Sequence, residues 1–339
     1  ISGSHAYGMA TESSDLDTRG VAIRSDKSYY LGFLKKFEQQ EDATKDDVVY
    51  DLKKFFSLAA DNNPNILELL FVDEKFIQKK TKYWEKILEH RDKFLSKNVR
   101  YRFLGYSYAQ LNRIKVSRNW LLNPPTKHPE RSDFGLPDRK LISADDLGAF
   151  QWIMVHLLKD SMDLLNFSES TKKELHDANW IGLIQRKGVA EETFATVQKL
   201  TGASDSWVEN MQKEQAYAQA KRNWDSYQNW KANRNKKRAV LEEKYGYDSK
   251  HATNLVRLCR MGKEILETGK VLVFRPDREE LLAIRNGAWS YEKIEEYAKT
   301  TEQEIIKTSE ISKLPKEPDR VFLDQLCVEI IESFMNESK

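Results

Sequence analysis

The sequence predicts an α+β protein in which a small α/β core precedes a mostly helical remainder. Two short β-type runs lie near the N-terminus, at residues 21–23 and 46–50. From Leu52 onward the apolar residues recur every three to four positions, the period of a helix that buries one face. Helical spacing then continues through most of the chain.

The first helical pattern ends at the Asn- and Pro-rich segment 61–65. Further helical patterns cover 84–94, 99–120, 144–165, 172–184, 191–199 and the chain after 249. The proline-rich segment 123–138 is the clearest break. We therefore expect a core at 1–80, a helical accessory region at 81–245 and a C-terminal helical unit at 246–339. The chain opens at Ile1 in what reads as a strand, so we expect a truncated N-terminus.

Composition excludes several classes of protein. The 339 residues carry a formal net charge of +2, too small to indicate a partner by itself. No apolar run approaches the ~18–20 residues of a membrane span, and no secretory leader is recognisable. We expect a cytoplasmic protein with no membrane partner, in which Cys259 and Cys327 are reduced, buried thiols.

Two short motifs near the N-terminus indicate chemistry. A Gly3-Ser4 turn lets backbone N–H groups and a hydroxyl approach phosphate oxygens. In the run Ser14-Asp15-Leu16-Asp17, a strand would point both carboxylates the same way. Two like charges that close are unfavourable unless a cation or a proton joins them, and Mg²⁺ bridges such carboxylates to substrate phosphates. An isolated pair of this kind is more often a solvated turn, so the combination with Gly-Ser carries the prediction.

This combination resembles the nucleotidyltransferase motif of the DNA polymerase β superfamily. The segment GSHAYGMATESSDLDTRGVAI, residues 3–23, resembles the motif of a narrower group, the RNA-repair-associated RlaP family. Two later stretches are similar to that family as well: DDVVYDLKKFFSLAADNNPNILELLF and KHATNLVRLCRMGKEILETGKVLVFRPDREELLAIRNGAWS. The resemblance implies a polymerase-β-type α/β core followed by a helical domain that closes on the nucleotide.

The resemblance also implies roles for individual residues. Gly3 and Ser4 would bind the triphosphate, and Asp15 and Asp17 would hold Mg²⁺ or Mn²⁺. A third carboxylate would be a metal ligand and a possible acceptor of the attacking hydroxyl's proton. Asp46 and Asp47 compete for that place. In the family's motif the acidic residue lies four positions before an aromatic residue. Asp46 has this spacing from Tyr50, so the resemblance favours Asp46.

The C-terminal stretch is expected to contribute Lys250, His251 and Arg257 near the base or the phosphates. The alternative is a helix with ordinary surface cations. Arg275 has two possible roles: it acts at the functional site, or it forms a salt bridge within a loop. Glu68 lies in an apolar run, and a buried carboxylate needs a partner.

Cations and aromatic residues alternate in two segments, 221–238 and 100–120. Such a mixture suits RNA, because cations neutralise phosphates and exposed rings stack on unpaired bases. The alternative is an amphipathic helix with a solvated basic face and buried rings.

The sequence thus predicts an enzyme that transfers a nucleoside monophosphate from a nucleoside triphosphate and releases pyrophosphate. An RNA 3′-hydroxyl is the expected acceptor, by analogy with the family. A protein side chain or a small molecule is the alternative acceptor. A catalytically silent RNA-binding module is the alternative from another class.

Overall fold

The computed structural model describes residues 1–12, 14–44, 46–163, 195, 198–199, 202–234 and 236–337. The chain forms two compact units, one of Ile1–Asn123 with Asn235–Lys339 and the other of Pro124–Arg234. This division differs from the boundaries expected at residues 80 and 245. The C-terminal helices share a core with the N-terminal segment, since α6 (Val99–Leu122) packs along α13 (Ser249–Thr268).

A three-stranded sheet lies in the first unit, in the order β1-β3-β2. Strand β3 (Asp47–Asp51) pairs in parallel with β1 (Thr18–Ala22) and antiparallel with β2 (Gln39–Glu41). Val48 and Tyr50 of β3 are buried, whereas Asp47 and Val49 are exposed. The expected extension of β1 through the two N-terminal aspartates is wrong, because the strand begins at Thr18.

Helices α3 (Leu52–Ala60) and α4 (Pro64–Leu70) follow the sheet and bury the predicted apolar face. Asn62 ends α3 with a positive φ of 56°. Its side chain is fully buried, donates to the carbonyl oxygen of Phe94 and accepts from Ser96. Asn63 then caps α4, where Pro64 occupies the first turn.

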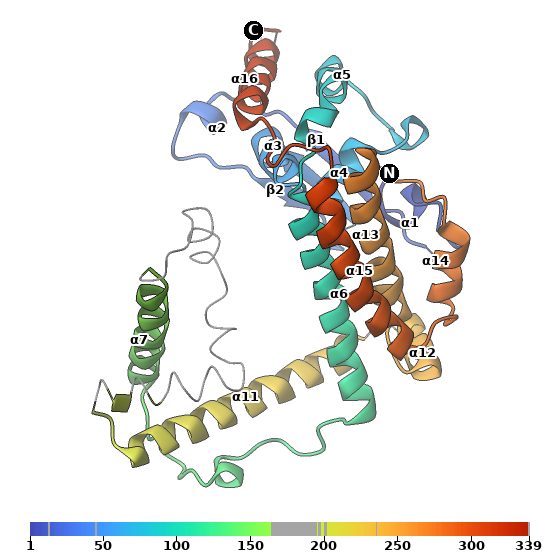
Figure 1. Cartoon of the computed structure of the whole chain (residues 1–339). Helices are drawn as coiled ribbons and strands as arrows, with labels where there is room; N and C mark the ends of the chain where they lie inside the picture. The colour runs from blue at the N-terminus through green and yellow to red at the C-terminus, as the bar shows by residue number, and fades with distance from the viewer. Residues whose placement is uncertain are drawn as a thin grey trace. The chain divides into compact units, whose positions relative to one another are not determined.

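Helices α6, α13 and α15 (Tyr291–Ile311) run alongside one another in Figure 1 and form the centre of the first unit. Gly262 permits this packing, because a Cβ at that position would lie 2.9 Å from Cβ of Phe103. The C-cap of α13 is Gly269 with a φ of 70°, a left-handed conformation that glycine adopts at helix ends. The remaining helices of this unit are α1 (Gly3–Ala6), α2 (Ser28–Leu31), η1 (Glu74–Phe76), α5 (Lys82–Glu89), η2 (Arg91–Phe94), α12 (Lys236–Tyr245), α14 (Arg278–Arg285) and α16 (Arg320–Glu337).

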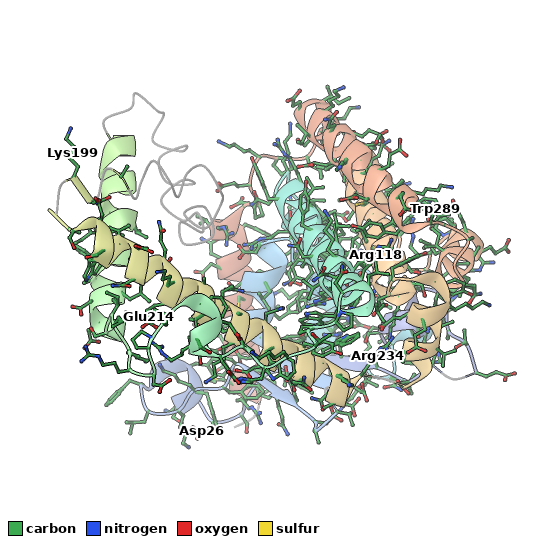
Figure 2. The ribbon with its side chains drawn as sticks, turned by 90° about the horizontal axis from the view of Figure 1, so that it is seen from below. Asp26, Arg118, Lys199, Glu214, Arg234 and Trp289 are labelled. Atoms are coloured by element: carbon green, nitrogen blue, oxygen red, sulfur yellow. The ribbon has the colours of Figure 1, made fainter. Side chains whose placement is uncertain are left out.

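The second unit contains η3 (Arg131–Phe134), α7 (Ala144–Asp163) and the long helix α11 (Asp205–Asn233). A small core of Ile142, Phe150 and Met211 joins α7 to α11. Arg131 pairs with both carboxylate oxygens of the buried Glu214, which Figure 2 labels on α11. The helix expected at 172–184 and most of that at 191–199 lie outside the described residues.

No helix in the described part of the chain is long and apolar enough to cross a membrane. Cys259 and Cys327 are buried, free thiols, as expected. Burial raises the pKa of the Cys259 thiol to about 11 and that of Cys327 to about 12.

Arg275 proves to be a structural residue. Its side chain is fully buried, pairs with both oxygens of Glu264 at 2.6 and 2.7 Å, and donates from Nε to Asp277 at 2.8 Å. Its backbone N–H donates to the carbonyl oxygen of Tyr7 at 3.1 Å, which ties the N-terminal motif to the C-terminal helices.

We predict that Arg275→Met lowers the free energy of unfolding by about 3 kcal/mol, because it leaves Glu264 without its buried partner, whereas Asp277 keeps Arg260 at 2.7 Å. Urea denaturation measures the change. The control Arg320→Met removes an exposed pair with Asp61 and is expected to cost less than about 1 kcal/mol. Equal losses in the two variants would contradict the structural role of Arg275.

Candidate functional site

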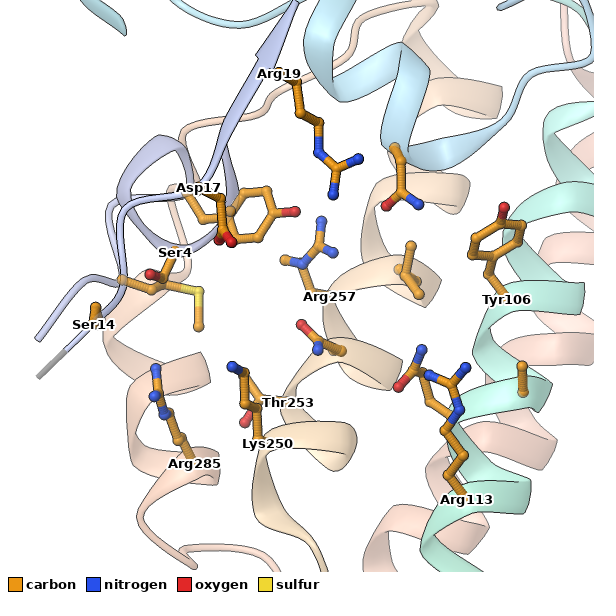
Figure 3. Close-up of a pocket in the computed structure, with 18 of the residues that line it drawn as sticks. Ser4, Ser14, Asp17, Arg19, Tyr106, Arg113, Lys250, Thr253, Arg257 and Arg285 are labelled. Carbon is orange, nitrogen blue, oxygen red and sulfur yellow. The ribbon is translucent and has the colours of Figure 1, made fainter. Parts of the chain in front are cut away.

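A cavity of about 950 Å³ lies in the first unit, among the N-terminal segment, the residue before β3, α4, α6, α13 and α14. Figure 3 shows side chains from these elements converging on it. The lining residues are Gly3, Ser4, Tyr7, Met9, Ser14, Asp15, Asp17, Arg19, Asp46, Asn65, Tyr101, Arg102, Gly105, Tyr106, Ala109, Gln110, Arg113, Lys250, Thr253, Asn254, Arg257, Leu258 and Arg285.

The pairing of β1 with β3 decides which carboxylates share this cavity. Thr18 stands opposite Asp47 in the parallel register, and its hydroxyl donates to the Asp47 carboxylate. Side chains alternate along a strand, so the preceding residues, Asp17 and Asp46, point to the other side. Asp17, Asp46 and Asp15 line the cavity, whereas Asp47 does not.

Gly3 allows the N-terminal turn to lie against Asp17. Its φ is +64°, and a Cβ there would lie 2.2 Å from Oδ2 of Asp17. The backbone N–H of Ser2 donates to the carbonyl oxygen of Asp17 at 2.8 Å. A side chain at position 3 would therefore displace Asp17, while Ser4 lies beside it on the cavity wall.

The carboxylates repel one another. Burial, and then the negative charges of Asp46 and Asp15, raise the pKa of Asp17, although Arg19 and Lys250 oppose the shift. The folded state therefore disfavours ionised Asp17, and a cation between the carboxylates would relieve this cost.

The donor set fits a hard divalent cation. No group of three or more His, Cys, Asp or Glu side chains within the described residues is arranged to hold a metal ion alone. Mg²⁺ usually takes only one or two protein carboxylates and completes its shell with water and substrate phosphates. Carboxylate oxygens suit Mn²⁺ equally.

Six cationic side chains outnumber the three carboxylates in the cavity wall. Two of the six are held by ion pairs, Arg102 with Asp61 and Arg257 with Glu68. The cavity wall also contains Arg19, Arg113, Lys250 and Arg285, and Figure 3 shows Lys250 and Arg285 on the side of Asp17. This excess of positive charge suits a polyanionic ligand.

Glu68 finds its partners in a buried network at the cavity wall. Arg257 donates to one of its oxygens, and the hydroxyl of Tyr7 donates to the other at 2.5 Å. The guanidinium of Arg257 also lies over the Tyr7 ring, 3.9 Å from its centroid. The network fixes Arg257 at the cavity, and burial raises the pKa of Tyr7.

Lys250 and Arg257 line the cavity, as the sequence prediction for the C-terminal helix requires, but His251 does not. The His251 ring instead contacts Gln110 of α6, with 2.7 Å between Nδ1 and Oε1. Its backbone N–H donates to Asp248, the N-cap of α13. The nucleotide-binding roles of all three residues stay predictions.

The two basic and aromatic segments have different surroundings. In the segment 100–120, Lys115 pairs with Glu295 and Arg118 donates to the carbonyl oxygen of Gly246. Arg102 and Arg113 reach the cavity. Most of the segment 221–238 lies on α11 in the second unit, and the side chains of 236–238 are outside those described.

Sequence reasoning missed four polar residues of the cavity wall. Asn65, Gln110, Asn254 and Arg285 line it, although none stands in a recognisable chemical motif. The first three belong to helices whose apolar pattern says only which face is buried. The packing of α6 on α13, which the sequence does not reveal, brings them together.

Comparison with known proteins bears on the N-terminal third of the chain. Residues 1–121 match the family described as RlaP, RNA repair pathway DNA polymerase beta family, which confirms the predicted resemblance over that range. Over 125 residues the chain is 30% identical to the uncharacterized 38.9 kDa protein in the nrdC-mobD intergenic region of Enterobacteria phage T4. The alignment covers 34% of the chain and 37% of the phage protein, so the chain spans little more than a third of that relative. No solved structure gives a significant match.

We predict that Asp17→Asn makes the protein as stable as the unmutated chain, or more stable, at neutral pH without divalent cations. A raised folded-state pKa means that ionised Asp17 destabilises the folded state. The advantage of the variant shrinks as the pH falls through the folded-state pKa towards the ordinary value of 3.8, where the carboxyl is protonated in both states. Thermal unfolding across this pH range measures it.

Asp47→Asn is the matched control, because it removes one charge on the opposite side of the sheet. Asp47 accepts from Thr18, so no gain is expected there. A clear loss of stability in Asp17→Asn at neutral pH would show that the carboxylate is a structural group.

Proposed function

We propose that this chain, whose residues 1–121 match the RlaP family, is a metal-dependent nucleotidyltransferase that adds a nucleoside monophosphate to an RNA 3′-hydroxyl. The supporting observation is that Gly3, Ser4 and the three aspartates Asp15, Asp17 and Asp46 line one cavity with an excess of cations. A site that combines paired acids with cations suits a nucleotide whose phosphates carry a metal.

The triphosphate would bind at the end of the cavity formed by Gly3 and Ser4. The close approach of the Gly3 backbone to Asp17 leaves no side chain between the turn and the acids. Lys250 and Arg285, on α13 and α14, would pair with the phosphate oxygens that the acids do not face.

Asp15, Asp17 and Asp46 would hold one or two divalent cations, which supply charge neutralisation at the α-phosphate and at the leaving pyrophosphate. The acceptor hydroxyl oxygen forms a bond to the α-phosphorus as the bond from that phosphorus to the pyrophosphate oxygen breaks. Asp46 would take the hydroxyl proton, since it lines the cavity next to Asp17.

Arg257 would stabilise the developing negative charge. Glu68 and Tyr7 hold its guanidinium before any ligand arrives, so little reorganisation is needed during the reaction. Phosphoryl transfer depends mainly on positioning and charge neutralisation of this kind.

Helix α11 supports RNA as the acceptor. It exposes Lys221, Arg222 and Lys231, and it carries the partly exposed rings of Trp224 and Trp230. Cations and aromatic faces together suit single-stranded nucleic acid. The description of the matched family as an RNA repair pathway family agrees with this choice.

We predict that Asp15→Asn, Asp17→Asn and Asp46→Asn each lower transfer by at least about 10²-fold, because each removes a charge that holds the metal or takes the proton. Asp47→Asn should keep transfer close to that of the unmutated protein. The measurement follows a labelled nucleoside triphosphate into total RNA or total protein with Mg²⁺ or Mn²⁺. Loss of activity in Asp47→Asn, with Asp46→Asn active, would reverse the assignment. If the label appears in protein and not in RNA, the acceptor is a protein and the proposed RNA acceptor is wrong.

We predict that replacing Lys221, Arg222 and Lys231 by Ala weakens RNA binding and reduces the salt slope of log K by about 2, because fewer counterions are released. Triphosphate binding should be unchanged. Replacing Lys299, Lys307 and Lys316 by Ala removes the same charge from elsewhere and serves as the control. An unchanged slope in the α11 variant would remove this helix from the RNA site.

A further inference from the structure

The two ends of the cavity differ in chemistry. At one end, the carboxylates lie near Lys250 and Arg285. The end formed by α4, α6 and α13 carries three primary amides, from Asn65, Gln110 and Asn254, and the ring of Tyr106. Figure 3 places Tyr106 across the cavity from Asp17.

Two of these amides have unused hydrogen-bonding capacity. The side chains of Asn65 and Asn254 line the cavity and make no hydrogen bond to any other residue that the structure describes. Each amide offers an N–H₂ donor and a carbonyl acceptor. A ligand that presents both donors and acceptors at its edge would satisfy them.

The third amide is held in one orientation. Oε1 of Gln110 accepts from Nδ1 of His251 at 2.7 Å, so the N–H₂ group of Gln110 is left for the cavity. Asp248 lies 3.5 Å from Nε2 on the far side of the same ring. His251 therefore orients the Gln110 amide and does not itself face the cavity.

Tyr106 is fixed in the same way, since Asn63 donates to its hydroxyl at 2.8 Å. Gly105, the neighbour of Tyr106 in α6, also lines the cavity, and a Cβ there would meet no atom within 4 Å apart from its chain neighbours. The cavity is therefore open at this point of α6.

We propose that this end of the cavity is a nucleobase subsite, in which Gln110 determines base specificity and His251 positions Gln110. The inference rests on the proposed nucleotidyl transfer. Amide side chains pair with the edges of bases, and tyrosine rings stack on their faces. The base belongs either to the incoming triphosphate or to the terminal nucleotide of the acceptor, since both meet at the acids.

The test compares the unmutated protein with Gln110→Ala and Gln110→Glu. Equilibrium binding and transfer rates are measured for the four ribonucleoside triphosphates, and then for four short RNAs that differ only in the 3′-terminal base. Asn112→Ala is the matched control, because it removes an exposed amide of α6 outside the cavity.

The unmutated protein should discriminate among bases by about tenfold or more. Gln110→Ala should reduce that ratio to about twofold, and Gln110→Glu should change the order of preference, because an acceptor replaces a donor. A change confined to the triphosphate series identifies the base as that of the incoming nucleotide. A change confined to the RNA series identifies it as that of the acceptor.

His251 provides a second test of the same subsite. His251→Ala should lose discrimination as Gln110→Ala does, and His251→Asn should restore it, because the Asn amide places a donor near the position of Nδ1. A purely structural role would lower stability in both variants without changing the base ratios.

Failure of this inference is separable from failure of the proposed function. Transfer by the unmutated protein, with base ratios that no Gln110 variant changes, would overturn the subsite alone. Binding of triphosphates without transfer would overturn the proposed function, and the binding ratios would then decide the subsite. A protein that binds neither triphosphates nor RNA would overturn both.

Discussion

The parallel pairing of β1 with β3 is the constraint on which the site depends. With Thr18 opposite Asp47, the residue before each strand faces the cavity, and these residues are Asp17 and Asp46. A shift of one residue would send the carboxylates to the other side of the sheet. The N-terminal turn also depends on the position of Asp17, because only a residue without a side chain fits against it at position 3. The local sequence thus places mutually repelling acids in one wall, at a cost that a bound cation would offset.

A second set of contacts ties this wall to helices more than 180 residues away. Arg257 of α13 and Tyr7 share Glu68, which lies 189 residues from Arg257 in the chain. Arg275 binds the backbone of Tyr7 while its side chain is held by Glu264. The N-terminal motif is therefore held from both sides by buried charge pairs, which are costly to break. Such rigidity suits a site that works by positioning and electrostatics.

Local patterns predicted much of this arrangement. Residue types and spacing indicated the α+β class and the helix after β3. The resemblance to the family favoured Asp46 over Asp47, and Asp46 is the one that lines the cavity. The local patterns misplaced the start of β1, because the SDLD run was expected on the strand but lies before its first residue, Thr18. They said nothing of Gln110 or Arg285, and they gave His251 a direct role where the structure shows contact with Gln110. These details depend on how α6, α13 and α14 pack against one another. The spacing of apolar residues within one helix does not reveal that packing.

The most direct test of the nucleotidyltransferase assignment is the fate of the phosphates. The unmutated protein is incubated with Mg²⁺, RNA and a nucleoside triphosphate labelled at the α-phosphate, and in parallel with one labelled at the γ-phosphate. Transfer of a nucleoside monophosphate predicts that RNA gains the α-label only and that the γ-label appears in pyrophosphate. Transfer of the γ-label to RNA, or release of that label as inorganic phosphate with no gain of α-label by any acceptor, would contradict the account.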